Sequence, residues 1–218
     1  MLTLVIGNKN YSSWSLRAWF LMSQAGIAFE EIRLPLDTEA FHREIPKYNA
    51  AHRVPVLCHG DLRVTDSLAI AEYLAELYPE HKLWPVDQRA RAHARSICAE
   101  MHSSFHALRD AMPMNCRATE RRVAMGREVA GNIERIRTVW RACHEQHGGS
   151  GPWLFGGFSI ADAFYAPVAS RFRTYGVPCG DVEAAYIEQV LSQPAMRAWY
   201  AAGETEVETI EREEVGVL

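Results

Sequence analysis

Hydrophobic and polar positions in the first third of the chain predict a small sheet covered by helices. Residues 2–6 form a short apolar run that is typical of a buried strand. Residues 28–34 alternate between polar and apolar and predict a second strand. Between these strands, apolar residues recur at helical spacing and stop at a glycine, which predicts a helix that ends there: Trp14, Ala18, Leu21, Met22, Ala25 and Gly26.

A hairpin and a further helix complete this part of the chain. Residues 56–58 pair with residues 62–64 across a short turn that contains glycine. Asp66 is a suitable N-cap for an apolar helix that reaches about Leu77, and residues 38–48 form a weaker helical segment. The pattern predicts an α/β domain over residues 1–79, with elements in the order βαβ, helix, hairpin, helix.

The rest of the chain shows helical periodicity. After a linker at residues 80–88, two long charged segments, 89–112 and 118–147, are separated by a proline and predict helices. Ser159 and Asp162 form a capping box at the start of another helix. We therefore expect an all-α domain over residues 89–218, whose acidic tail from Glu204 onward is loosely held.

Composition and charge exclude several classes of protein. The net charge of −4 gives no long-range attraction for nucleic acid or anionic lipid. A local group of arginines is expected to form a solvated helix face: Arg117, Arg121 and Arg122. No apolar run is long enough for a membrane span. Five cysteines without Cys-x-x-Cys spacing indicate a reducing compartment, and we expect a cytoplasmic protein.

Two residue pairs point to a ligand. Pro55 cannot donate a backbone hydrogen bond, so Val54-Pro55 marks the start of a strand. Asp66-Ser67 stands where the hairpin ends and the helix begins, so its oxygens and the free amides of the first helical turn converge on one region. Such a region can hold an amino-acid-like ligand.

These motifs, in this order and spacing, resemble those of cytosolic glutathione S-transferases over nearly the whole chain. The resemblance implies a thioredoxin-like N-terminal domain, an all-α C-terminal domain and glutathione as co-substrate. It also implies that Pro55 is cis, that the backbone of Val54 meets the cysteinyl part of glutathione, and that Asp66-Ser67 hold the γ-glutamyl group. The capping box resembles the one that opens the buried helix of the family's second domain.

Two further stretches resemble particular branches of the superfamily. Residues 11–17, Tyr-Ser-Ser-Trp-Ser-Leu-Arg, are similar to the zeta-class pattern Ser-Ser-Cys-x-Trp-Arg, with Trp14 at the cysteine position and Leu16 at the tryptophan position. Residues 100–105 and 113–115 are similar to a bacterial branch of the superfamily. Ser12 matches the first serine of the zeta-like pattern, which implies that its hydroxyl meets the thiol of glutathione.

The first loop is suited to stabilise an anion. A free thiol has a pKa of about 8.5, so an enzyme that uses its thiolate must lower that pKa. Ser12, Ser13 and Ser15 supply hydroxyls where the first helix begins, and the helix N-terminus adds partial positive charge. Ser12 is the first candidate for the catalytic hydroxyl and Ser13 is the second, although Ser12 also fits a simple N-cap.

The expected site residues fall into two sets. The glutathione-binding set is Ser12, Trp14, His42, Arg53, Val54, Asp66 and Ser67, in which His42 and Arg53 are candidates for the glycine carboxylate and are equally suited to solvent. The substrate-pocket set is Trp14, Phe105, Arg109, Met112 and Asn115. No metal site is expected, because His102 and His106 share a helix face without a third ligand in a motif.

Three functions follow. The first is a glutathione transferase that directs the thiolate at a small, partly apolar electrophile. The second is glutathione-dependent cis–trans isomerisation of an unsaturated diacid of the maleylacetoacetate type, which requires arginines near the pocket. The third is a non-catalytic glutathione-binding or interaction module on the same fold. The resemblance also implies a homodimer whose contact uses the helix after Asp66 and the helix that begins near Arg89.

Overall fold

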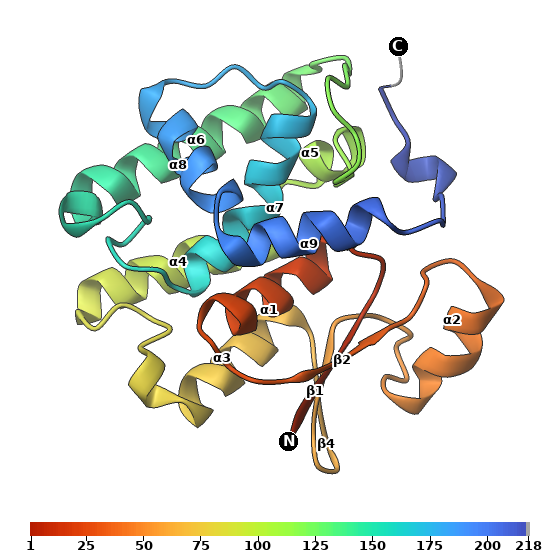
Figure 1. Ribbon diagram of the computed structural model, residues 1–218. Helices are drawn as coiled ribbons and strands as arrows, with labels where there is room; N and C mark the ends of the chain where they lie inside the picture. Colours follow the sequence, from red (N-terminus) through yellow and green to blue (C-terminus); the bar gives the residue numbers. More distant parts are fainter. Residues whose placement is uncertain (217–218) are drawn as a thin grey trace.

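The N-terminal part of the chain is a four-stranded mixed sheet with helices on both faces (Figure 1). The computed structural model describes residues 1–216. The strands lie in the order β2-β1-β3-β4. Strand β1 (Leu2–Ile6) pairs in parallel with β2 (Glu30–Arg33) and antiparallel with β3 (Val56–His59), which forms a hairpin with β4 (Leu62–Thr65).

Alternation along β1 separates two layers of core. Leu4 and Ile6 belong to the main core on the face covered by α1 (Ser13–Gln24) and α3 (Ser67–Leu77). Val5 points the other way and packs with Phe41 of α2 (Glu39–Glu44) and Ile45 of the 3₁₀ turn Ile45–Lys47. Because side chains in a strand point to opposite faces in turn, one apolar run serves both layers. The predicted thioredoxin-like arrangement is confirmed.

The remainder of the described chain is helical, as predicted. Its elements are the 3₁₀ turn Pro79–His81, α4 (Gln88–Ser103), α5 (His106–Ala111), α6 (Arg127–His147), the 3₁₀ turn Gly148–Ser150, α7 (Ile160–Thr174), α8 (Asp181–Leu191), α9 (Pro194–Glu204) and the 3₁₀ turn Glu211–Glu213. Helix α7 is buried nearly throughout and packs against α1, α4 and α8, so it joins the two halves (Figure 1). It begins at the predicted capping box of Ser159 and Asp162.

Two predicted helices have different bounds in the structure. The segment 89–112 is interrupted at Phe105, whose φ of 63° is left-handed and ends the helical path before α5. The segment 118–147 becomes helical only at Arg127. Residues 112–126 are instead held by contacts to distant backbone, such as the hydrogen bond from Arg121 N to Thr174 O at 3.0 Å. Periodicity alone could not reveal these partners.

The acidic C-terminal segment, residues 205–216, is fastened to the protein, and the prediction of a loosely held tail is wrong. Glu206 accepts hydrogen bonds from the backbone amides of Lys9 and Asn10 at 2.7 and 3.1 Å. Glu214 pairs with Arg121 at 2.6 Å. The nearby Arg117 donates to the carbonyl of Glu206. Arg117 and Arg121 therefore bind the C-terminal segment, and they do not form the solvated helix face that their spacing suggested.

Helices long and apolar enough to cross a membrane are absent from the described residues.

Candidate functional site

Ser12 ends the first loop and caps α1. Its hydroxyl donates to Ser15 Oγ at 2.8 Å and lies 3.4 Å from the Ser15 amide nitrogen, which donates to it. Ser15 Oγ in turn accepts from the Gly7 amide at 3.1 Å. Ser12 is buried, with 7% of its surface exposed. The N-cap role considered for Ser12 is therefore present, and its hydroxyl hydrogen is directed at Ser15.

Ser13 has a different environment. It is half-buried, and its Oγ accepts a hydrogen bond from Arg171 Nη2 of α7 at 3.3 Å. Arg171 is itself fixed, because its Nε donates to the Met112 carbonyl at 2.7 Å. A hydroxyl that accepts from a guanidinium keeps its own hydrogen for another acceptor and becomes a better donor.

Trp14 is the contact point between the first loop and the helical half. Its ring meets the edge of His102 in α4, with centroids 5.1 Å apart and planes at 84°. The guanidinium carbons of Arg17 and Arg109 lie 4.3 and 5.0 Å from the Trp14 ring centroid. These are cation–π distances. Trp14 and Arg109 are only half-buried, so this contact point is open to solvent at its rim.

The guanidiniums beside Trp14 form a positive region. Burial, followed by the charges of Arg109 and Arg171, lowers the pKa of Arg17 to about 9, and burial lowers the pKa of Arg171 to about 10. Both side chains therefore remain charged at neutral pH. Within residues 1–216, Arg17 Nε and Nη1 are buried without a hydrogen-bond partner. The negative charges of Asp66 and Glu213 only partly oppose these effects on Arg17 and Arg171, and a buried cation is costly, so the region favours an anion.

Asp66 and Ser67 lie at the N-terminus of α3. Asp66 has a φ of 82°, and its Oδ1 accepts from the amides of Leu68 and Ala69 at 2.8 and 3.3 Å. Its other oxygen, Oδ2, lies 3.1 Å from His102 Nε2. Ser67 is 1% exposed, and among the described residues its hydroxyl has no hydrogen-bond partner. A buried hydroxyl without a partner beside a helix N-terminus fits a bound carboxylate.

The structure thus brings Trp14 and Asp66 together through the ring of His102, while Ser13, next to Trp14 in the chain, contacts Arg171. Val54 precedes β3, and its bond to Pro55 is cis, as the family resemblance implied. His42 and Arg53 are exposed, and the contacts described above include neither of them.

Three residues expected to line the substrate pocket are deeply buried. Phe105 and Met112 have 5% and 0% of their surface exposed. Asn115 is 1% exposed, and its Oδ1 accepts from Asn10 Nδ2 at 3.0 Å while its Nδ2 donates to Glu214 at 2.8 Å. Its amide therefore braces the first loop and is buried away from the partly open region. Of that set, Trp14 and Arg109 reach the partly open region.

Sequence reasoning missed three residues of this region: Arg17, His102 and Arg171. Arg17 was visible as the last residue of the zeta-like pattern, which was the available signal. His102 was considered only as a metal ligand. Arg171 lies 158 positions from Ser13, so no local signal could have joined them.

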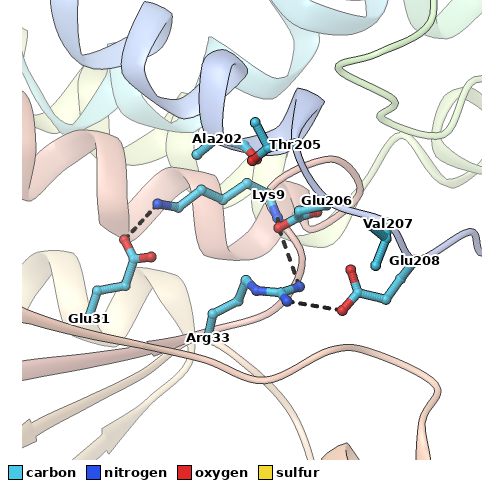
Figure 2. A pocket seen from close by; sticks show the side chains of 8 residues that line it. All are labelled: Lys9, Glu31, Arg33, Ala202, Thr205, Glu206, Val207 and Glu208. Carbon is cyan, nitrogen blue, oxygen red and sulfur yellow. Dashed lines mark hydrogen bonds and ion pairs between the residues drawn. The ribbon is translucent and has the colours of Figure 1, made fainter.

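A pocket of about 310 Å³ lies elsewhere, between β2 and the C-terminal segment (Figure 2). Its charged side chains pair with one another, Lys9 with Glu31 at 2.8 Å and Arg33 with Glu208 at 2.9 Å. Its lining includes none of the residues expected to bind glutathione or substrate. We interpret this pocket as the junction that holds the C-terminal segment.

Metal binding gains no support from the described part of the chain, in which no three His, Cys, Asp or Glu side chains gather in a way that could hold an ion.

Fold and site together define a class of protein. A thioredoxin-like domain with a cis-proline before its third strand, followed by an all-helical domain, is the fold of the glutathione transferases. Two family models match this chain, "Glutathione S-transferase, N-terminal domain" over residues 11–77 and "Glutathione S-transferase, C-terminal domain" over residues 126–202. The chain belongs to the glutathione S-transferase superfamily.

Similar proteins include several classes of this superfamily. A probable maleylacetoacetate isomerase of Caenorhabditis elegans is 33% identical over 97 residues, which are 44% of this chain and 45% of that protein. Glutathione S-transferase 1 of Dianthus caryophyllus is 40% identical over 82 residues, 37% of each chain. This chain therefore spans about half or less of the length of these curated relatives.

Among solved structures, a glutathione transferase homologue from Burkholderia with bound glutathione superposes with a TM-score of 0.71 at 24% identity. The alignment covers 94% of this chain and 99% of that one. A tau-class glutathione S-transferase from mango gives a TM-score of 0.70 at 17% identity, over 98% of this chain and 96% of that one. At these identities the likeness establishes the fold.

Proposed function

We propose that this protein is a glutathione transferase, in which the first loop activates the thiol of glutathione for attack on a small electrophile. The observation that carries the proposal is that Trp14, the residue after Ser13, and Asp66, at the N-terminus of α3, contact the same His102 ring. Beside Asp66 lies the buried Ser67 hydroxyl, which has no hydrogen-bond partner among the described residues. The Burkholderia homologue was solved with glutathione, which supports the choice of ligand.

The groups at the start of α3 match the ends of the γ-glutamyl part of glutathione. The Ser67 hydroxyl and the helix N-terminus suit its carboxylate, since both offer hydrogen atoms to an anion. The Asp66 carboxylate suits its ammonium group, since it is partly exposed and carries negative charge. In this arrangement the backbone of Val54 meets the cysteinyl part, and its thiol extends toward the first loop.

Activation of the thiol is assigned to the two serines, with Ser13 as the stronger candidate. The Ser12 hydroxyl already donates to Ser15, whereas the Ser13 hydroxyl accepts from Arg171 and keeps its hydrogen. One hydrogen bond to an anion contributes about 1.5–3 kcal/mol, which corresponds to about one to two units of pKa. The positive charge of Arg171 acts in the same direction.

The reaction requires no other group from the described residues. The thiol loses its proton to solvent, and the thiolate sulfur attacks an electron-poor carbon. A carbon–sulfur bond forms, and either the bond to a leaving group breaks or the electrons of a double bond move to the neighbouring carbon, which takes up a proton. Trp14 supplies apolar surface and Arg109 supplies charge for the electrophile beside the thiol.

Titration of bound glutathione tests this proposal. Thiolate absorbance in the ultraviolet is followed against pH with wild-type protein and with Ser13→Ala. We expect the pKa of the bound thiol to lie below that of free glutathione in wild type, and to rise by about one to two units in the variant. Binding with an unshifted pKa would instead support the non-catalytic module, and a failure to bind at millimolar glutathione would refute the proposal.

Glutathione-dependent cis–trans isomerisation is the second candidate, and the positive region around Arg17, Arg109 and Arg171 favours it. Guanidinium groups gathered at one place suit the carboxylates of an unsaturated diacid. The thiolate would add to the double bond, the resulting single bond would rotate, and the thiolate would leave again. Conversion of a maleylacetoacetate-type diacid without consumption of glutathione would establish this reaction, and absence of turnover would remove it.

We further propose a cytoplasmic homodimer. The exposed face of α4 carries small residues, Ala92, Ser96 and Ala99, beside the Glu72–Arg95 pair that links it to α3 at 3.0 Å. Sedimentation equilibrium distinguishes monomer from dimer.

A further inference from the structure

We propose that His102, in the helical half, is a positioning residue of the glutathione site, which holds the Asp66 carboxylate for the ammonium group of glutathione. The inference rests on the proposed function and adds a residue from the second half of the chain to a site otherwise built by the first. It identifies the part of the ligand that His102 serves, the γ-glutamyl amine.

The two oxygens of Asp66 have different partners. Oδ1 accepts from the amides of Leu68 and Ala69, so it serves the N-cap of α3. Oδ2 lies 3.1 Å from His102 Nε2. The Asp66 side chain is 45% exposed, so an arriving ammonium can reach it. Without His102, rotation of the carboxylate would be limited only by the N-cap contacts of Oδ1.

The His102 ring is held by its surroundings. The Trp14 ring meets its edge at 5.1 Å, and the Phe164 ring lies at 6.4 Å on a plane tilted by 38°. Its Nδ1 is buried, without a hydrogen-bond partner among residues 1–216, while Nε2 faces Asp66. The ring therefore presents one nitrogen to one acceptor, which is the geometry expected of a side chain that orients another.

The charge state of His102 leaves the charge of Asp66 available. Burial is the main cause that lowers the pKa of His102, the positive charges of Arg17 and Arg109 add to it, and the negative charge of Asp66 opposes it. Neutral imidazole can donate Nε2–H to Oδ2 without cancelling the carboxylate charge. A protonated imidazole would instead pair with Asp66 and compete with the glutathione ammonium.

Calorimetric titration of glutathione at pH 8 tests the proposal with four proteins: wild type, His102→Ala, His102→Gln and His106→Ala. Gln keeps an N–H donor near the position of Nε2. His106 is the matched control, since it is exposed on the following helix and its ring nitrogen lies 3.1 Å from the Ser103 carbonyl, away from Asp66. We expect His102→Ala to weaken glutathione binding about five- to tenfold, and the other two variants to stay within about twofold of wild type.

Two further measurements separate positioning from a structural effect. The thiol pKa of bound glutathione should be the same in His102→Ala and wild type, because His102 acts at the γ-glutamyl end. The Asp66→Asn variant should bind weakly, and adding His102→Ala to it should change affinity by less than about twofold, since both substitutions disturb one interaction.

The outcomes that overturn the inference are distinct from failure of the proposed function. If wild type binds glutathione and His102→Ala binds it equally well, His102 has no part in the site. Full additivity of the two substitutions would show that His102 does not act through Asp66. A wild-type protein that does not bind glutathione refutes the proposed function before any variant is compared.

Discussion

At the scale of single residues, neighbouring serines in the first loop have separate tasks. Ser12 caps α1 through Ser15, and Ser13 accepts from Arg171. Adjacent positions at a helix start point in different directions, so one hydroxyl can satisfy the backbone while the next faces the ligand. Under the proposed function, this difference gives Ser12 a part in stability and Ser13 a part in activating the thiol.

Replacement of Ser12 should therefore affect folding first. We expect Ser12→Ala to lower the free energy of unfolding by about 1 kcal/mol, because the first turn of α1 loses its capping oxygen. Ser12→Thr, which keeps that oxygen, should lose less. Chemical denaturation of the three proteins measures the effect. Unchanged stability in Ser12→Ala together with a raised pKa of the bound thiol would make Ser12 the thiol donor instead.

Sequence could predict those residues of the site whose roles are local. Asp66 stands at a hairpin-to-helix junction, and its N-cap geometry follows from the residues on either side. The partners of Ser13 and Asp66 in the helical half could not be predicted, since Arg171 and His102 reach the site only when α7 and α4 pack against the first domain. Helical periodicity predicts that a side chain faces the core, but it does not predict which residues that side chain contacts.

At the scale of elements, the start of α7 depends on one buried carboxylate. Asp162 Oδ2 accepts from the amide and hydroxyl of Ser159 at 2.8 and 3.0 Å, and Oδ1 accepts from the Leu154 amide at 3.1 Å and the Tyr186 hydroxyl at 3.2 Å. Burial nevertheless raises the pKa of Asp162 from 3.8 to about 6, so desolvation outweighs these four donors.

This raised pKa predicts a pH dependence of stability. Between pH 3.8 and about 6 the folded protein binds a proton at Asp162 that the unfolded chain does not. The stabilisation of the folded state by this proton is therefore present at low pH and is lost as the pH rises through about 6. Relative to Asp162→Asn, we expect wild type to gain roughly 2–3 kcal/mol of unfolding free energy from pH 7 to pH 4. Urea denaturation of both proteins across this range measures the difference.

The comparison with Asp162→Asn isolates this one carboxyl. His93 and His102 have pKa values lowered mainly by burial, so their contribution to the free energy of unfolding falls as the pH is lowered. Both proteins contain these histidines, so this contribution cancels in the difference between them. A difference that does not vary with pH would contradict the prediction.

The end of a helix could be predicted where the residue that ends it is recognisable in the local sequence. Gly26 follows the end of α1 at Gln24 with a φ of 70°, as its position in the sequence predicted. The break at Phe105 carries no glycine or proline, and its left-handed backbone is found only in the fold, where its side chain is buried in the core. Tertiary packing overrides helical periodicity there.

At the scale of the whole molecule, the C-terminal segment joins the two ends of the chain. The Glu206 carboxylate accepts from the amides of Lys9 and Asn10 just before the two serines, and Arg33 lies 3.6 Å from the same carboxylate (Figure 2). Tyr11 donates to Glu214 at 2.7 Å. The loop that carries Ser12 and Ser13 is thus fixed by residues about 200 positions away.

We expect Glu206→Ala to remove the two hydrogen bonds that hold the first loop against the C-terminal segment. Two backbone amides would lose a charged acceptor, which should lower the free energy of unfolding by about 2 kcal/mol, or the melting temperature by about 4–8 °C. Val207→Ala is the matched control, because the Val207 side chain is 90% exposed and should have little effect. Calorimetry of the three proteins measures the stability.

The same pair of variants tests whether the C-terminal segment serves the chemistry as well as the fold. If Glu206 holds the first loop in its active geometry, the pKa of bound glutathione should rise in Glu206→Ala at temperatures where the variant is fully folded, and remain unchanged in Val207→Ala. Loss of stability with an unchanged thiol pKa would limit the role of Glu206 to the fold. A loss of stability together with a raised thiol pKa would make the C-terminal segment a part of the glutathione site that acts through the first loop, since the Glu206 carboxylate contacts only the backbone of that loop.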